Sequence, residues 1–205
     1  SVDLDRLSSE YGRYQFVQSV VRQVAYSTLS RRERKQTHLR VLDAMSRDGA
    51  PELASVAAQH AVSAIEAGPE DADVPELKGR AVGLLRQAAS RAHDLGAPAE
   101  AAGHLRRALE LVTAGVEQHE IQLSMATALL DAGKYDDALS QASAARAGFS
   151  TLHDLPLEAI AAAALARSLV EGPADNEGAV DVIEPYYHRL KEVPAALGAF
   201  GEVIR

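Results

Sequence analysis

The chain carries seven histidines, the side chains that most often bind metals and act as general acids or bases near neutral pH. They are spread over the sequence: His38, His60, His93, His104, His119, His153 and His188. None falls in the His-Glu-x-x-His spacing of a zinc protease. The sequence has no cysteine, so thiolate ligands are excluded. We therefore expect structural or surface histidines and no metal site.

Acidic pairs are the next candidates for catalysis. Glu70-Asp71 and Asp136-Asp137 stand in expected turns or at expected helix starts, where carboxylates stabilise exposed backbone N–H groups. The sequence also lacks a serine nucleophile elbow and a glycine-rich phosphate loop. These observations predict a chain that is not an enzyme, with no catalytic residues and no cofactor.

A basic burst, Arg31-Arg32-Glu33-Arg34-Lys35, has two interpretations. It can be the solvated first turn of a helix, although four cations there oppose the helix dipole. Alternatively, Arg31, Arg32, Arg34 and Lys35 form a contact surface for another domain or for phosphate groups. The net charge of −8 argues against DNA contact and against nucleic acid as a partner.

Four other residues are candidates for contacts in a groove. His104 and Arg107 lie on an expected helix, where they either line a groove or are solvated. Tyr186 and Tyr187 are adjacent, so one should face inward and the other outward. An exposed tyrosine can anchor a bound peptide, whereas an inward one fills the core.

The composition favours stacked helices. Apolar residues make up 47% of the chain, aromatic residues only 4%, and 39 residues are alanine. Alanine is the best intrinsic helix former and lets helices approach closely. No run approaches the ~20 apolar residues of a membrane span, so we expect a cytoplasmic protein without a membrane partner.

The order of elements is expected to be helical almost throughout. Residues 14–17, "YQFV", favour a short strand. A helix should begin at residue 19, and a second should follow a capping box formed by Ser30 and Glu33 and end near residue 46. The later helices are expected at about 51–68, 74–95, 98–113, 119–132, 135–149, 156–170, 177–190 and from 194 onward.

Two segments align without gaps, 37 residues apart: 88–111, "AASRAHDLGAPAEAAGHLRRALEL", and 125–148, "MATALLDAGKYDDALSQASAARAG". Each has a glycine after its first helix and an alanine opening its second: Gly96 and Gly133, Ala101 and Ala138. One helix pair cannot bury its apolar face alone, so such pairs stack. The fold class predicted is all-α, an antiparallel helix-hairpin superhelix with a groove.

The pair pattern resembles the tetratricopeptide (TPR) repeat. "AGKYDDAL" (132–139) matches the turn of that repeat well, and "LGAPAEAA" (95–102) matches it less closely. The Trp and Leu-Gly signature of the family's first helix is absent. The resemblance implies TPR-like repeats over residues 49–205.

Residues 14–45 resemble a segment of bacterial, especially actinobacterial, regulators that follows an ATPase module of the AAA/STAND type and precedes TPR-like repeats. The matching residues are Tyr14, Phe16, Val21, Arg22, Val24, Ala25, Tyr26, Leu29, Arg34, His38 and Val41. Gln18 replaces the family's usual histidine. The resemblance implies that residues 1–48 are the tail of a winged-helix-like domain plus a linking helix, in a fragment of a longer protein.

Regulators of this kind often carry an adenylate/guanylate cyclase or a LuxR-type DNA-binding domain. The resemblance therefore implies a non-catalytic protein-interaction region that couples partner or ligand sensing to other domains. Its partner would be the ATPase module of the same protein or an external protein. The alternative is a stand-alone TPR scaffold that binds peptide segments in its groove.

Overall fold

The computed structural model describes residues 19–48, 50–172 and 174–190. Within these ranges the regular elements are nine α-helices and one short 3₁₀ helix, with no strand. The α-helices are α1 (Ser19–Thr28), α2 (Arg31–Asp48), α3 (Ala54–Ala67), α4 (Val74–Asp94), α5 (Pro98–Leu109), α6 (Val116–Asp131), α7 (Tyr135–Thr151), α8 (Leu155–Glu171) and α9 (Asn176–Leu190). The predicted all-α class is confirmed. The strand expected at 14–17 and the helix expected from 194 lie outside the described residues.

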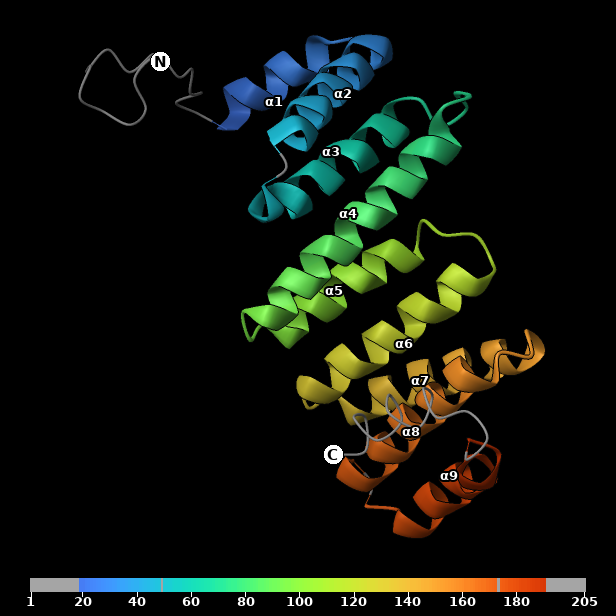
Figure 1. Ribbon diagram of the computed structural model, residues 1–205. Helices are drawn as coiled ribbons and strands as arrows, with labels where there is room; N and C mark the ends of the chain where they lie inside the picture. The colour runs from blue at the N-terminus through green and yellow to red at the C-terminus, as the bar shows by residue number, and fades with distance from the viewer. Residues whose placement is uncertain (1–18, 49, 173, 191–205) are drawn as a thin grey trace.

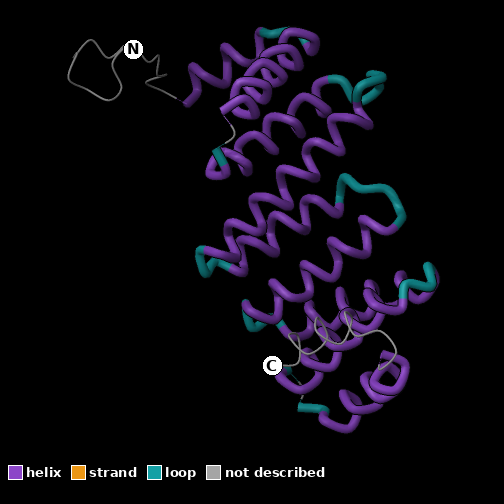
Figure 2. Tube along the Cα trace, in the orientation of Figure 1, coloured by secondary structure: helices purple, strands orange, loops and turns teal. Residues whose placement is uncertain are grey.

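The helices stack in chain order, and successive helices run in opposite directions (Figure 1). The packing contacts follow this order, since α2 to α9 each pack chiefly on their neighbours in sequence. Connections are short, as the tube in Figure 2 shows, and short connections favour antiparallel neighbours. The described chain is therefore a series of packed helix pairs, consistent with a helical repeat.

The start of α2 has the capping box expected from the sequence. The Ser30 backbone N–H donates to Glu33 Oε2 at 2.8 Å, and the Glu33 N–H donates to Ser30 Oγ at 3.3 Å. Hydrogen bonds from Ser30 lower the pKa of the Glu33 carboxyl. Two of the helix's exposed N–H groups are satisfied in this way, which offsets part of the unfavourable basic charge nearby.

The two aligned segments turn in the same way after their first helices. Gly96 and Gly133 have φ angles of 72° and 69°, the left-handed region that favours glycine. In both turns the next residue's N–H returns to the helix: Ala97 to the Ala92 carbonyl and Lys134 to the Leu129 carbonyl, each at 2.8 Å. The turn between α7 and α8 has the same geometry but places His153 in the left-handed region, with φ 57°.

Alanine dominates the packed interior. The largest cluster of buried residues extends from α3 to α8 and includes Leu85, Leu105, Ile121 and Leu129 among many alanines. In α8 the run of residues 161–164 is four alanines, all fully buried. Small side chains on facing helices permit this close approach.

Several helix boundaries differ from the expected ones. The helix expected at 98–113 ends at Leu109, because Leu111 and Val112 turn back to pack against the core instead of continuing the helix. After Gly115, with φ 152°, α6 begins at Val116 rather than at residue 119. The helix expected at 51–68 starts with a 3₁₀ turn at Pro51–Leu53. None of the described helices is both long and apolar enough for a membrane span.

Candidate interaction site

A cavity of about 390 Å³ opens between α4 and α6, the first helices of two consecutive pairs. We call it the α4–α6 cleft. Its lining residues are Arg86, Ala89, Ser90, His93, Ala101, Leu105, Ser124, Thr127 and Ala128. The buried side chains of α5 form its base, and α4 and α6 form its two walls.

The walls of the cleft arise from helical spacing. Along α4, Arg86, Ala89, Ser90 and His93 occupy positions i, i+3, i+4 and i+7, which places them on one face. Ser124, Thr127, Ala128 and Asp131 have the same spacing along α6. On each helix a small buried alanine alternates with polar residues. The cleft is therefore apolar at its base and polar at its rim.

Ion pairs bridge the two walls. At one end, Arg86 Nη1 lies 3.3 Å from Glu120 Oε2 and 3.7 Å from Glu117 Oε1. At the other end, His93 Nδ1 lies 3.6 Å from Asp131 Oδ2. Arg86 and His93 are 40% and 52% exposed, so solvent screens these pairs and each contributes little stability. The bridges are therefore easy to exchange for other partners.

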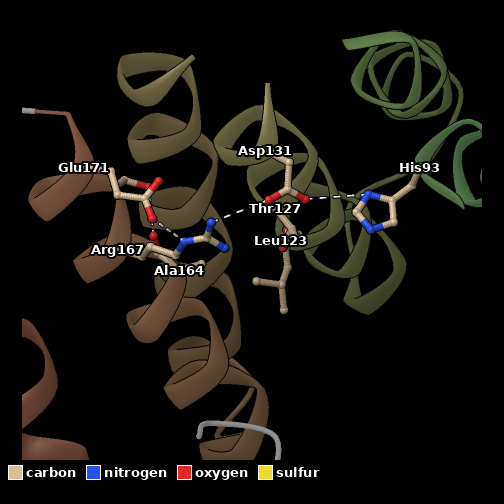
Figure 3. A network of polar contacts seen from close by, with 8 residues as sticks. His93, Leu123, Thr127, Asp131, Ala164, Arg167 and Glu171 are labelled. Atoms are coloured by element: carbon tan, nitrogen blue, oxygen red, sulfur yellow. Dashed lines mark hydrogen bonds and ion pairs between the residues drawn. The ribbon is translucent and has the colours of Figure 1, made fainter. Parts of the chain in front are cut away.

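The network at the second end continues onto α8. Figure 3 shows Asp131 between His93 on one side and Arg167 on the other. Arg167 Nη2 lies 3.6 Å from Asp131 Oδ1, and its Nε donates to Glu171 Oε1 at 2.7 Å. The hydrogen bond to Glu171 raises the pKa of Arg167. Charged side chains thus connect the first helices of three consecutive pairs.

The two hydroxyl groups on the α6 wall both donate to backbone carbonyls of their own helix. Ser124 Oγ donates to the Glu120 carbonyl at 3.0 Å, and Thr127 Oγ1 donates to the Leu123 carbonyl at 3.3 Å. A hydroxyl that donates its one hydrogen keeps oxygen lone pairs for accepting. The α6 wall therefore offers mainly acceptors.

The basic burst is divided by the structure. Arg31 and Arg32 are exposed and line an open cavity of about 760 Å³ beside the acidic loop 69–73. Arg34 instead turns back along its own chain. Its Nε donates to the Leu29 carbonyl at 3.0 Å, and its guanidinium lies 5.1 Å from the centre of the Tyr26 ring.

Lys35 is bound within the chain. It is 8% exposed, and its Nζ donates to Asp71 and Asp73 at 2.5 Å each. Burial alone would lower the pKa of its ammonium, but the hydrogen bonds to the two aspartates outweigh that effect and the pKa lies above its usual value. Lys35 therefore anchors the loop before α4 to α2, and its ammonium faces this loop.

Of the four residues considered for a groove, the three with described side chains do not come together. His104 lies on α5 beside Glu100, at 3.5 Å, and Arg107 donates to Gln59 of α3 at 2.5 Å. Tyr186, on α9, is 5% exposed, packs against the alanines of α8 and donates to Glu158 at 2.7 Å. The expectation that one tyrosine of the pair faces inward holds for Tyr186. The side chain of Tyr187 lies outside the described part of the chain.

A second polar cluster joins α1, α2 and α3. Tyr26 Oη lies 2.8 Å from His38 Nε2, and His38 Nδ1 lies 2.8 Å from His60 Nδ1. The two facing Nδ1 atoms can share one proton in a hydrogen bond. Protonation of both imidazoles would instead bring two N–H donors and two positive charges together. Burial lowers the pKa of both imidazoles, and their mutual repulsion lowers that of His38 further.

Sequence reasoning missed the residues that line the cleft. The signal available was the shared i, i+3, i+4, i+7 spacing of small and polar residues on the two first helices. It occurs at Arg86, Ala89, Ser90 and His93 and again at Ser124, Thr127, Ala128 and Asp131. The described residues contain no group of three His, Cys, Asp or Glu side chains that could hold a metal ion.

Comparison with known proteins found no matching family model, no matching curated protein and no matching solved structure. The class of this chain is therefore defined by its own architecture. It is an all-helical domain of sequentially packed helix pairs, consistent with a helical repeat.

Proposed function

We propose that this chain is a non-catalytic protein-interaction and regulatory region of a multidomain signalling ATPase of the cytoplasm, linked to a cyclase or a transcriptional regulator. The α4–α6 cleft is the observation that carries the proposal. It is a hollow with an apolar base and an exchangeable polar rim, situated between stacked helix pairs. Surfaces of this kind suit an extended segment of a partner protein.

The link to an ATPase rests on the resemblance of residues 14–45 to the segment that follows the ATPase module in bacterial regulators. Arg31 and Arg32 support this link, because both are exposed at the start of α2 and line an open cavity. Lys35 does not add to such a surface, since it is bound to Asp71 and Asp73. The contact with the module would therefore depend on the first two arginines.

The test is calorimetric titration of the chain with the ATPase module of its own parent protein, without nucleotide and with ATP or ADP. We expect binding whose affinity changes with the nucleotide, because coupling requires that the repeat region contact two states of the module differently. The double variant R31E/R32E should weaken binding by about tenfold or more through charge reversal at the contact.

The matched control is Arg40→Glu, which changes the charge of an exposed arginine farther along α2. Acidic residues at positions 31 and 32 favour the helix dipole, so the double variant should keep its fold. Absence of binding in every nucleotide state would contradict the ATPase-linked role. If Arg40→Glu weakens binding as much as R31E/R32E does, Arg31 and Arg32 do not form the contact.

A second function, a stand-alone adaptor for peptide segments, is supported by the same cleft. An adaptor would bind an external segment with unchanged affinity whether or not the ATPase module and nucleotide were present. The chain has only four lysines, Lys35, Lys78, Lys134 and Lys191, which argues against recognition of a peptide carboxylate by a cluster of lysines.

A further inference from the structure

The base and the rim of the α4–α6 cleft select for different chemistry. The base consists of buried apolar side chains: Ala89, Ala101, Leu105 and Ala128. Because three of these are alanines, the base leaves room for a larger side chain from outside. The burial of one leucine-sized side chain would supply most of the apolar contact.

The rim carries more carboxylates than cations. The carboxylates that pair with its lining residues are Glu117, Glu120 and Asp131. The guanidinium groups beside them are Arg86, which lines the cleft, and Arg167 of α8, which pairs with Asp131. An excess of negative charge at a hollow with low-dielectric walls attracts cationic groups. The pairs of Arg86 with the two glutamates are long and partly exposed, so an incoming cation can compete with Arg86 for them.

The hydrogen-bonding groups of the rim also favour a basic ligand. Ser124 and Thr127 donate to backbone carbonyls, which leaves their oxygens as acceptors toward the cleft. Lysine and arginine side chains are pure donors, whereas a carboxylate is a pure acceptor. A basic ligand therefore matches both the charge and the hydrogen-bonding pattern of the α6 wall.

The separation of the acidic groups sets the spacing of a ligand. Glu120 and Asp131 are on one helix, and at about 1.5 Å of rise per residue they lie roughly 16 Å apart along its axis. Four residues of an extended chain cover about 13 Å at roughly 3.3 Å each, and long basic side chains reach over the remainder. Side chains four positions apart also point to the same side of an extended chain. The apolar base lies between the two ends.

The geometry points to an extended partner segment with two lysine or arginine residues four positions apart and an apolar residue midway between them, so that all three side chains share one face. One basic side chain would lie at Glu117 and Glu120 and the other at Asp131, with the apolar side chain on Leu105 at the base. This inference rests on the proposed function, because it names the chemistry of the partner that the interaction region would take.

The probe is a labelled peptide, Lys-Ser-Leu-Ser-Lys, flanked by Gly-Ser residues, in fluorescence anisotropy at low salt. Its twins replace both lysines with glutamine or with glutamate, and a third twin keeps the composition but places the lysines side by side. We expect the lysine peptide to bind about tenfold more tightly than the glutamine twin, and more weakly as salt rises. Equal or tighter binding of the glutamate or the adjacent-lysine peptide would overturn the inference.

Charge variants of the chain locate the site. The double variant E120Q/D131N should weaken the lysine peptide by about tenfold. The double variant E110Q/E177Q removes the same charge from two exposed positions, one directly after α5 and one on α9, and should leave the affinity unchanged. Equal effects of the two variants would show a response to net charge alone and would contradict the cleft as the site.

Two single variants keep the inference falsifiable if the first double variant loses stability. Arg86→Gln removes the internal competitor of the incoming cation, so binding should become a few-fold tighter. Ser90→Phe fills the exposed mouth of the cleft without changing charge and should abolish binding. A loss of affinity in Arg86→Gln, or unchanged affinity in Ser90→Phe, would contradict the model.

The results also separate this inference from the proposed function. If the ATPase module binds in a nucleotide-dependent way but the lysine peptide does not bind, the basic-segment inference fails and the regulatory function stands. If the lysine peptide binds at the cleft and the module does not bind in any state, the inference stands and the ATPase link fails.

Discussion

Two regions of the described helix stack use charge in opposite ways. At the N-terminal end, Lys35 is buried and held by Asp71 and Asp73 at hydrogen-bonding distance. In the α4–α6 cleft, Arg86 is partly exposed and its carboxylate partners lie at 3.3 and 3.7 Å. A buried cation with two close partners stabilises one arrangement of helices, whereas an exposed one can be exchanged. Lys35 is therefore expected to stabilise the fold in the first region, and binding of a basic segment is expected in the second.

The largest expected effect is the loss of Lys35. Lys35→Met should lower the free energy of unfolding by about 2 kcal/mol, because it leaves Asp71 and Asp73 without their buried partner, while their partial exposure limits the cost. Chemical denaturation followed by circular dichroism measures the change. A change below about 0.5 kcal/mol would place Lys35 among the exchangeable charges and remove the contrast between the regions.

The next effect concerns the left-handed turns. Gly133→Ala should destabilise the chain by about 1 kcal/mol, because alanine is strained at a φ of 69° and nothing lies within 4 Å to compensate. His153→Gly should stabilise it by a similar amount, because His153 adopts the same conformation at φ 57°. Thermal denaturation checks both variants. Changes of the same sign would contradict the equivalence of the two turns.

A smaller effect is expected from pH at the histidine cluster. The pKa of His38 and that of His60 are lowered in the folded state, so the unfolded chain binds protons more readily. Their contribution to stability is complete above about pH 6.5 and is lost as the pH falls from there through the folded pKa values. Tyr26 and Arg34 face this cluster from α1 and α2, and Glu66 partly offsets the shift of His38.

The measurement for the histidine cluster is the free energy of unfolding as a function of pH. The double variant H38Q/H60Q should flatten the decline below pH 6.5, and His104→Gln serves as the control because it lies on α5 away from the cluster. An unchanged slope in the double variant would show that other groups cause the acid sensitivity. The partial exposure of both rings keeps the expected effect below about 1 kcal/mol.

The smallest expected change in stability belongs to Arg86. Arg86→Gln should alter the free energy of unfolding by no more than about 0.5 kcal/mol, since its ion pairs are exposed and long. The same denaturation experiment compares it with Lys35→Met. A loss as large as that of Lys35→Met would make Arg86 a structural residue and would weaken the case for an exchangeable rim.

Much of the fold follows from local sequence. The capping box of Ser30 and Glu33 and the glycine turns at Gly96 and Gly133 were predictable, because each depends on a few adjacent residues. The end of α5 was not, because Leu111 and Val112 leave the helix to reach a core built by distant residues. Tertiary packing overrides local periodicity at such positions.

The candidate site was less predictable than the fold. Lys35 belongs to a basic run for which the sequence favours a solvated helix start. Only the tertiary structure brings Asp71 and Asp73 to it. The cleft likewise requires the distance between α4 and α6, which depends on the small residues of the intervening α5. The spacing of His93 and Asp131 within their helices was visible in the sequence, but their pairing was not.

The most direct measurement is a nuclear magnetic resonance titration of the ¹⁵N-labelled chain with the lysine peptide. We predict that chemical-shift changes concentrate at Ser90, His93, Ser124 and Thr127, and that the amides around Lys35 remain unchanged. Shifts centred on Lys35 and the loop 69–73, or spread evenly over the helices, would contradict the division into a structural end and a binding cleft.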